Sequence, residues 1–239
     1  MKERLQKIIS NAGITSRRDA ERMIMDGRVS VNGVVIRQMG AKADIDKDEL
    51  RVDGRLILLD ISKIYLMVNK PKGYVTTLND PERRPIVTDL LSGISERVFP
   101  VGRLDYDSEG LLLMTNDGDF AQKLQHPRFR IPKTYEVKIE GNMVNHDFQS
   151  LIKGIRLNDG RFKPDNVQII KRNPLSTWLA LTISEGRNRL IRRGLMELGY
   201  SVARLIRTAI SDLKLGNLKT GTYRYLTTVE VKNLLSLSK

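Results

Sequence analysis

Apolar side chains at the start of the chain recur with the period of an amphipathic helix. They are Leu5, Ile8, Ile9 and Ala12. Gly13 stands where a helix over residues 3–12 would end. Next, Ser16-Arg17-Arg18-Asp19 has the form of a capping box, in which Ser16 and Asp19 each accept a free main-chain amide. The pattern predicts a second helix, with three inward side chains: Ala20, Met23 and Ile24.

After Gly27 the apolar residues alternate with polar ones, as in a strand, and no longer recur at helical spacing. Two pairs of apolar residues, Val29 and Val31 and then Val34 and Ile36, flank Asn32-Gly33. Asn-Gly suits a tight turn that needs positive φ at both central residues, so this segment predicts a hairpin. We therefore predict a small helix-helix-hairpin domain over residues 1–60 and a larger domain over residues 61–239. Residues 53–63 are assigned to a linker or to the last strand of the small domain.

The larger domain mixes strand and helix patterns without strict alternation. Strands are predicted at 64–69, directly after the loop at Asp105, and at 133–140, 167–171, 178–184 and 202–210. Helices are predicted at 86–91, at 119–125, between Asn188 and Gly199, and after a capping box at Thr227–Glu230. This order predicts an α+β fold whose mainly antiparallel or mixed sheet is flanked by helices.

Charge narrows the class of partner. The 239 residues include 41 Lys and Arg against 28 Asp and Glu, a net charge of +13, so a polyanion is the expected partner: RNA, DNA or an anionic membrane. The chain has no Cys, and His126 and His146 have no metal-ligand spacing, so no metal site is predicted. No apolar run approaches the length of a membrane span, and we expect a soluble cytoplasmic protein.

Four arginines in the small domain are candidates for phosphate contacts: Arg17, Arg18, Arg22 and Arg28. Arg17 and Arg18 lie in the first turn of the second predicted helix, where positive charge opposes the helix dipole. That placement suggests a use other than stability, although an ordinary solvated helix face is the alternative. The helix-helix-hairpin order, with Ser16 to Glu21 and Gly27 to Gly33, resembles the S-four type RNA-binding domain, and the resemblance covers about the first 55 residues.

The segment Gly102-Arg103-Leu104-Asp105-Tyr106-Asp107-Ser108-Glu109-Gly110 is a charged loop that runs directly into an apolar strand. Such a loop can present a reactive side chain at a sheet edge, although a lone Asp more often caps a turn. The segment closely resembles the catalytic motif of the ribosomal RNA pseudouridine synthases of the RsuA/RluB family. The resemblance implies that Asp105 is the catalytic carboxylate and that Arg103 contacts the substrate.

Three further segments resemble motifs of the same family. Lys133-Thr134-Tyr135-Glu136-Val137 matches the motif whose Tyr lies against the target uracil, which implies that role for Tyr135. The run from Glu185 to Arg193 matches the motif whose basic residue pairs with the catalytic Asp, which implies Arg192. A buried carboxylate needs such a guanidinium to stay ionised.

Leu205 matches an aliphatic residue packed under the base, with core packing as the alternative. Three remaining arginines become candidates for RNA phosphates: Arg187, Arg189 and Arg193.

The resemblance implies isomerisation of a uridine in ribosomal RNA, without a cofactor, by a monomer. The context after Asp105 favours the branch that acts on large-subunit RNA. Alternatives are the same reaction on small-subunit RNA, a non-catalytic ribosome-assembly factor, and, more weakly, a DNA-binding regulator. The chain departs from the family pattern at three positions: Leu190, where many relatives carry Gln, Gly194, where they carry Met, and Ser211, where Gly is usual.

Overall fold

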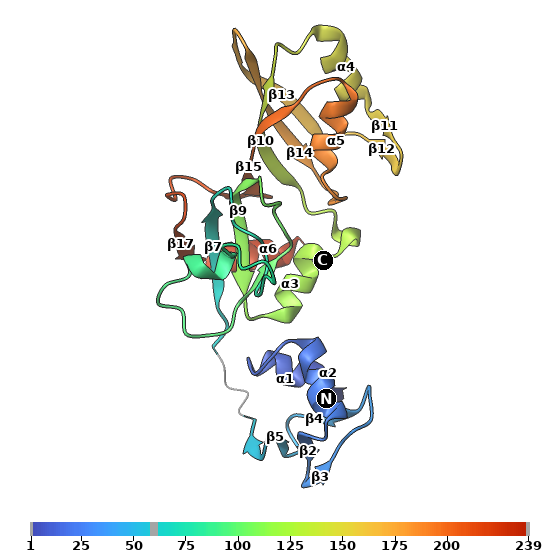
Figure 1. Ribbon diagram of the computed structural model, residues 1–239, viewed down its shortest axis with the longest axis vertical. Helices are drawn as coiled ribbons and strands as arrows, with labels where there is room; N and C mark the ends of the chain where they lie inside the picture. Colours follow the sequence, from blue (N-terminus) through green and yellow to red (C-terminus); the bar gives the residue numbers. More distant parts are fainter. Residues whose placement is uncertain (1, 58–61, 238–239) are drawn as a thin grey trace. The chain divides into compact units, whose positions relative to one another are not determined.

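The computed structural model describes residues 2–57 and 62–237 (Figure 1). The chain forms two compact units. The first contains Met1–Ile64, Ile94–Val98 and Asn116–Gly118, and the second contains Tyr65–Gly93, Phe99–Thr115 and Asp119–Lys239. The predicted boundary between residues 60 and 61 lies outside the described residues. Across 2–57 and 62–237, no helix has the length and apolar character needed to cross a membrane.

The first unit is built from two short helices and small sheets. Its elements are β1 (Lys2–Arg4), α1 (Leu5–Asn11), α2 (Arg17–Met25), β2 (Val29–Val31), β3 (Val34–Val35), β4 (Lys42–Asp44), β5 (Leu50–Val52) and β6 (Arg55–Leu56). The strands pair in the order β3-β2-β5-β6, with β1 against β4. The predicted inward side chains of α2 are buried in one apolar core with Leu5, Ile8 and Ile9, which confirms both helical patterns.

Local sequence signals act in this unit largely as predicted. Asn32 and Gly33 have φ of 52° and 80°, so the hairpin turn forms at these two residues. Ser16 caps α2 by accepting the Asp19 main-chain amide at 3.1 Å. The second half of the capping box is wrong, because the Asp19 carboxylate accepts the Ser16 hydroxyl at 2.6 Å instead of the Ser16 amide. Asp is one methylene shorter than the Glu usual at this position, so it reaches the nearer hydroxyl.

The second unit begins with strand β7 and ends with helix α6. Its elements are β7 (Tyr65–Lys70), the 3-10 turn η1 (Val87–Leu90), β8 (Phe99–Val101), β9 (Glu109–Thr115), α3 (Gly118–Gln125), the 3-10 turn η2 (Pro127–Phe129), β10 (Lys133–Glu140), α4 (Asn145–Lys153), β11 (Ile155–Leu157), β12 (Gly160–Phe162), β13 (Asn166–Asn173), β14 (Ser176–Ile183), α5 (Leu190–Glu197), β15 (Val202–Ile210), β16 (Leu213–Lys214), β17 (Tyr223–Tyr225) and α6 (Thr228–Ser236). The predicted capping box of α6 is present: Glu230 donates its main-chain amide to the Thr227 hydroxyl, and its carboxylate accepts the Thr227 amide.

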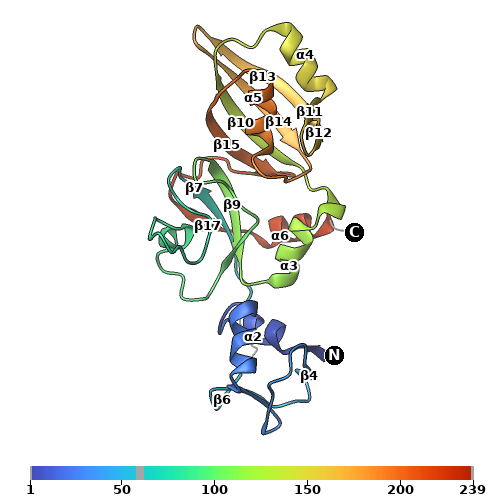
Figure 2. The same ribbon diagram turned by 45° about the vertical axis from the view of Figure 1, so that its right-hand side comes forward.

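Within the described residues, nine strands form one mixed sheet. Its main path is β13-β14-β10-β15-β9-β7-β17, with β8 beside β9 and β16 beside β15. The strands pair antiparallel except for β9 and β15, which run parallel. The predicted α+β class with a mixed sheet is therefore confirmed. Helix α5 lies over the face of the β10–β14 region, as Figure 2 shows, while α3 and α6 contribute Phe120, Leu124 and Leu234 to the apolar core around β9.

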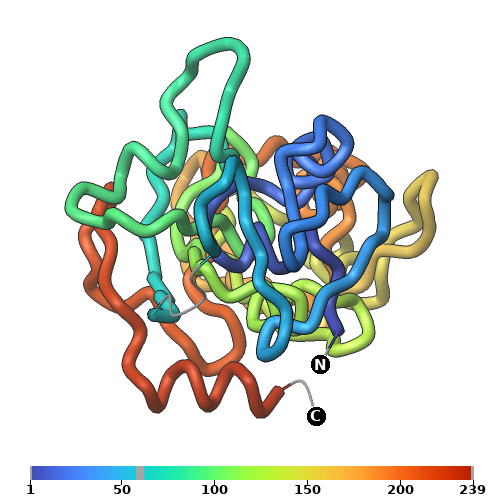
Figure 3. Tube along the Cα trace, turned by 90° about the horizontal axis from the view of Figure 1, so that it is seen from below, coloured from blue at the N-terminus to red at the C-terminus, as the bar shows by residue number. Residues whose placement is uncertain are grey.

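Strand β9 pairs with three other strands of this sheet, β15, β7 and β8. Its residues Leu111 to Met114 are all at most 1% exposed, because the strand is covered on both faces. Between β7 and β8 the chain runs in irregular loops around the single turn η1, seen as the green excursions in Figure 3. The loop before β9 is therefore attached to the most deeply buried strand of the sheet. This attachment positions the segment that contains Asp105.

Candidate active site

The loop between β8 and β9 presents Asp105 at the edge of the sheet. Leu104 is buried, and the Thr76 hydroxyl holds its main chain through two hydrogen bonds. The hydroxyl donates to the Leu104 carbonyl at 2.7 Å and accepts the Leu104 amide at 3.3 Å. The Ser108 amide donates to the Asp105 carbonyl at 3.0 Å and closes a turn. The Asp105 side chain keeps 29% of its surface exposed. The backbone around Asp105 is thus held in place while the carboxylate stays accessible to a substrate.

A buried lysine lies beneath this loop. Lys70, the last residue of β7, is fully buried, and its ammonium donates to three carbonyls, those of Pro71, Asp105 and Ser108, at 3.0, 3.1 and 2.8 Å. Burial lowers the pKa of Lys70 to about 8, opposed by the nearby carboxylates of Glu109, Asp105 and Asp107. At neutral pH the three N–H donors of the ammonium match the three carbonyls. Lys70 therefore fixes both ends of the Asp105 turn.

Two arginines at the start of α5, Arg189 and Arg192, lie against the same loop, and Arg192 contacts Asp107 instead of the predicted Asp105. Arg192 donates from Nη2 to the Asp107 main-chain carbonyl at 2.9 Å and lies 3.2 Å from the Asp107 carboxylate. Among the described residues, the predicted ion pair between Arg192 and Asp105 is not formed. Arg192 also donates from Nη1 to the Val202 carbonyl at 3.0 Å, so two main-chain carbonyls hold its guanidinium beside residue 107.

Among the described residues, Arg189 supplies the one cation within 4 Å of the Asp105 carboxylate. It occupies the N-cap position of α5 without a side-chain capping bond, with φ of 46°, and its guanidinium binds both oxygens of the Asp107 carboxylate at 3.3 and 3.2 Å. The distance from Arg189 Nη1 to Asp105 Oδ2 is 3.9 Å. Partial burial raises the pKa of Asp107, but the hydrogen bonds of Arg189 and the charge of Arg192 outweigh it, so the net pKa lies below the ordinary value. Burial lowers the pKa of Arg192, and the Asp107 charge opposes that shift.

Tyr135 and Leu205 reach the same region through the strand register. Tyr135 on β10 pairs with Arg207 on β15, and Arg207 in turn pairs with Gly110 at the start of β9. Leu205 lies two residues before Arg207, opposite Val137, and therefore shares the face of Tyr135. Tyr135 is 8% exposed and Leu205 is 6% exposed. A Cβ on Gly110 would lie 2.3 Å from the Arg207 carbonyl, so only glycine permits this close pairing of β9 with β15.

The remaining predicted RNA contacts in this unit differ in how they are held. Arg103 is exposed on the loop beside Asp105. Arg193 and Arg187 both bind Asp159, at 2.8 and 3.1 Å, and Arg187 also binds Glu185 at 2.8 Å. Arg187 and Arg193 therefore share Asp159, which lies on a different segment from the Asp107 that binds Arg189 and Arg192.

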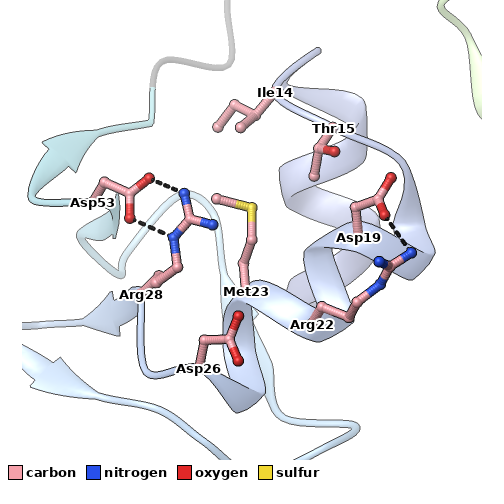
Figure 4. A pocket seen from close by; sticks show the side chains of 8 residues that line it. All are labelled: Ile14, Thr15, Asp19, Arg22, Met23, Asp26, Arg28 and Asp53. Atoms are coloured by element: carbon pink, nitrogen blue, oxygen red, sulfur yellow. Dashed lines mark hydrogen bonds and ion pairs between the residues drawn. The ribbon is translucent and has the colours of Figure 1, made fainter.

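In the first unit, the four predicted arginines divide into two kinds. Arg28 makes a two-bond ion pair with Asp53, at 2.8 and 2.6 Å, and Arg22 binds Asp19 at 2.8 Å (Figure 4). These pairs border a pocket of about 490 Å³. Arg17 and Arg18 are exposed and form no ion pair among the described residues. Their charges are the ones most available to RNA phosphates.

Sequence reasoning gave no individual role to three residues of this site: Lys70, Thr76 and Asp107. Lys70 carries a signal that could have been used, because a lysine that continues a run of buried strand residues needs a specific set of acceptors. Asp107 and Thr76 carry no such signal. Their roles arise from contacts with Arg192, Arg189 and Leu104, which are far away in sequence.

The three departures from the family pattern have local consequences. Gly194 on α5 lies under the Phe162 ring of β12, and a Cβ at this position would approach the ring to 2.2 Å. A Met here would require Phe162 to move. Ser211 has φ of 50°, in the left-handed region that explains why Gly is usual at this position. Leu190 is buried in the first turn of α5.

The family matches of the two units define an enzyme that modifies RNA and has a separate RNA-binding unit. Residues 64–197 match the RNA pseudouridylate synthase family, and residues 3–44 match the S4 domain. The chain belongs to the RNA pseudouridylate synthase family and is an isomerase.

Individual relatives agree over nearly the whole length. The chain is 43% identical to an uncharacterized RNA pseudouridine synthase of Aquifex aeolicus, over 98% of this chain and 94% of the relative. It is 41% identical to the ribosomal large subunit pseudouridine synthase B of Bacillus subtilis, over 99% of this chain and 97% of the relative. A crystal structure of a pseudouridylate synthase superimposes with a TM-score of 0.66 and 28% identity, covering 97% of this chain and 99% of the other.

Proposed function

We propose that this protein converts a specific uridine of ribosomal RNA, in the large subunit, to pseudouridine, with Asp105 as the catalytic carboxylate. The observation that carries the proposal is the accessible Asp105 carboxylate on a turn fixed by Lys70, with the Arg189 guanidinium 3.9 Å away. The choice of RNA rests on the Bacillus subtilis relative, whose name assigns it to the large ribosomal subunit. Asp105, Tyr135 and Arg192 come from one chain, so a monomer suffices to build the site.

The reaction breaks the bond between ribose C1′ and uracil N1, which leaves with the bonding electron pair, turns the base, and joins C1′ to uracil C5. C5 then loses its proton and N1 takes one up, so the product is an isomer of the substrate. Asp105 would either attack C1′, to be displaced later when C5 bonds to C1′, or remove the C2′ proton to give a glycal and return that proton when C5 adds. Tyr135 offers a flat ring and a hydroxyl for the flipped base, with Leu205 packed on the same side. Arg192 would act through Asp107, which it contacts, in place of the direct pair with Asp105 that the sequence suggested.

The first unit and the basic surface would hold the RNA. Arg17 and Arg18 offer exposed charge for phosphates, whereas Arg22 and Arg28 would first have to separate from Asp19 and Asp53. Near the catalytic loop, four further arginines would bind RNA phosphates: Arg103, Arg187, Arg189 and Arg193. An arginine that is not paired with a carboxylate can bind an RNA phosphate more readily than one that is.

The test is incubation of the purified protein with ribosomal RNA from a strain that lacks it, followed by carbodiimide labelling and primer extension. We expect one new stop in large-subunit RNA. The Asp105→Asn variant should give no stop and bind the RNA with unchanged affinity, because the substitution removes the charge without changing the shape. The matched control is Asp212→Asn, an exposed carboxylate of the same unit, which should retain full activity.

Other outcomes correct defined parts of the proposal. A stop in small-subunit RNA would change the substrate and leave Asp105 in place. Turnover by Asp105→Asn would reject the catalytic role. Tight binding without a stop, on naked RNA and on assembly intermediates alike, would favour a ribosome-assembly factor.

A further inference from the structure

The pocket of the first unit differs in charge from the chain as a whole. Its volume is about 490 Å³, and its charged lining consists of two arginines and three aspartates: Arg22, Arg28, Asp19, Asp26 and Asp53. Three negative charges therefore face two positive ones, on a chain whose net charge is +13. A phosphate inside this pocket would meet an excess of negative charge, so the pocket suits a neutral group better than a phosphate.

The guanidinium of Arg28 offers such a group a flat surface. Arg28 donates from Nε and Nη2 to the two oxygens of the Asp53 carboxylate, at 2.8 and 2.6 Å. These hydrogen bonds hold the pKa of Asp53 below its usual range, so the pair stays ionised at neutral pH. Two parallel bonds fix the plane of the guanidinium, while 48% of the Arg28 side chain remains exposed. RNA bases stack on guanidinium planes of this kind.

A thioether and an unpaired carboxylate complete the surface. Met23 is 9% exposed and lies between the two ion pairs of the pocket in the view of Figure 4. Asp26, the C-cap residue of α2, is exposed, and its carboxylate makes no hydrogen bond or ion pair with residues 2–57 or 62–237. An ionised carboxylate accepts two parallel N–H donors, one on each oxygen. The pocket thus combines an apolar contact, a stacking plane and a pair of acceptors.

We propose that this pocket binds a single unpaired guanine of the RNA substrate, stacked on Arg28 and held at its Watson–Crick edge by Asp26. The inference rests on the proposed function, because that function makes RNA the ligand. Guanine presents N1–H and N2–H side by side on this edge, whereas the other three bases place an acceptor next to each donor. The volume lies within the range of about 300–1,000 Å³ that is usual for small-ligand sites.

The exposed arginines of α2 favour an RNA strand over a basic peptide as the occupant. Arg18 precedes Arg22 by four residues, which is about one helical turn of 5.4 Å, and Arg17 and Arg18 are both exposed. Their charges attract the phosphates that flank a bound base and repel a basic peptide. Phosphates would therefore lie outside the pocket while the base enters it, so Arg28 contacts a base without leaving Asp53.

The first experiment measures binding of the full-length protein to fluorescein-labelled RNA heptamers by anisotropy. The probes are UUUGUUU, UUUAUUU and UUUIUUU, in which inosine lacks the N2 amino group of guanine. We expect the guanine heptamer to bind about tenfold more tightly than the adenine heptamer and about threefold more tightly than the inosine heptamer. Equal affinity for the three heptamers would overturn the inference.

The Asp26→Asn variant separates recognition of the base from general charge attraction. General attraction predicts tighter binding to RNA, because the substitution removes a negative charge. The pocket predicts the opposite, namely binding of the guanine heptamer that is about tenfold weaker and no preference among the three probes. The matched control, Asp46→Asn, removes the same charge from an exposed residue outside the pocket lining and should keep the preference. Tighter guanine binding by Asp26→Asn would contradict the proposal.

A second variant, Arg28→Lys, tests the stacking plane. It keeps the positive charge and loses the flat guanidinium, so the guanine heptamer should bind about three- to fivefold more weakly with an unchanged salt slope. A thermal melt first shows that each variant folds. Unchanged affinity, or a loss of affinity that comes with a smaller salt slope, would reject stacking on Arg28 in favour of a phosphate contact.

Because these experiments measure binding and not turnover, they fail separately from the proposed function. An active enzyme without guanine preference would lose only the pocket assignment. A protein that prefers guanine and forms no pseudouridine would lose only the proposed reaction. An arginine-rich peptide that binds wild type and loses about tenfold in affinity with Asp26→Asn, without any guanine preference, would assign the pocket to a basic protein segment and overturn the inference.

Discussion

The ammonium of Lys70 donates a hydrogen bond to the main-chain carbonyl of Asp105 at 3.1 Å, from a side chain with no exposed surface. The same ammonium binds the Ser108 carbonyl at 2.8 Å, so it joins β7 to both ends of the catalytic turn. A charged donor that bridges carbonyls in a water-excluded site holds them more firmly than neutral donors would. The orientation of Asp105 therefore depends on a residue 35 positions earlier in the chain.

Replacing Lys70 by Met should loosen this turn without leaving a large cavity. We expect the free energy of unfolding to fall by about 1–3 kcal/mol, because three carbonyls lose the hydrogen bond from the Lys70 ammonium, although the Asp105 carbonyl keeps the one from the Ser108 amide. We expect kcat to fall at least about tenfold, since Asp105 is no longer held in one geometry. Urea denaturation and single-turnover assays measure both. Lys72→Met, at an exposed lysine of the same turn, is the control, and equal behaviour of the two variants would contradict the role of Lys70.

Gly194→Ala should destabilise the protein, although Gly to Ala within a helix normally stabilises by about 0.5–1 kcal/mol. The added Cβ would approach the fully buried Phe162 ring to 2.2 Å, and overpacking of this kind costs about 1–3 kcal/mol. A double-mutant cycle of Gly194→Ala and Phe162→Ala, measured by urea denaturation, tests this contact. In a Phe162→Ala background the same Gly194→Ala substitution should become stabilising, and a loss of stability in both backgrounds would refute the contact.

The ion pair of Arg224 with Glu230 should make stability depend on acid pH. Hydrogen bonds from Arg224 hold the pKa of Glu230 at about 2, against 4.5 for an ordinary glutamate. Because the folded-state pKa is the lower one, the contribution is complete above pH about 4.5 and is lost as the pH falls toward 2. Glu230→Gln should therefore cost about 1–3 kcal/mol at pH 7, and the difference from wild type should shrink toward pH 2.

The measurement is the free energy of unfolding of wild type and Glu230→Gln between pH 7 and the acid limit of folding. Glu197→Gln serves as control, because Glu197 is exposed on α5 and makes no ion pair among the described residues. A wild-type advantage that stays constant down to pH about 2.5 would rule out the linkage.

Arg17→Gln with Arg18→Gln should weaken RNA binding and flatten its dependence on salt. Each phosphate contact removed lowers the slope of log K against log salt concentration by about 0.7–0.9, so the double variant should lose about 1.5. Binding of ribosomal RNA fragments over a salt series measures this slope. The control, Arg51→Gln with Arg55→Gln, removes two arginines from β5 and β6 of the same unit. An identical loss of slope in both variants would show general charge attraction instead of contacts at α2.

The sequence predicted well those elements that have a complete local pattern. Strands 133–140 and 202–210 have the predicted bounds, because eight or nine residues suffice to display alternation. The predicted helix at 86–91 is only the 3-10 turn Val87–Leu90. Strands β8, β11 and β12 have three residues each and could not be found by period, and α4 begins without a side-chain cap.

By itself, the sequence determined the class of the protein, its two kinds of folding unit, and the identity of the residues offered for catalysis, because motifs and periods are local properties. Only the tertiary structure decided how those residues are paired. Arg192 contacts Asp107, and Lys70 contacts the backbone of Asp105, through strands and helices that are distant in the chain. Which of two carboxylates a guanidinium binds depends on shifts of about an ångström, and those are set by packing of α5 and β7 against the sheet.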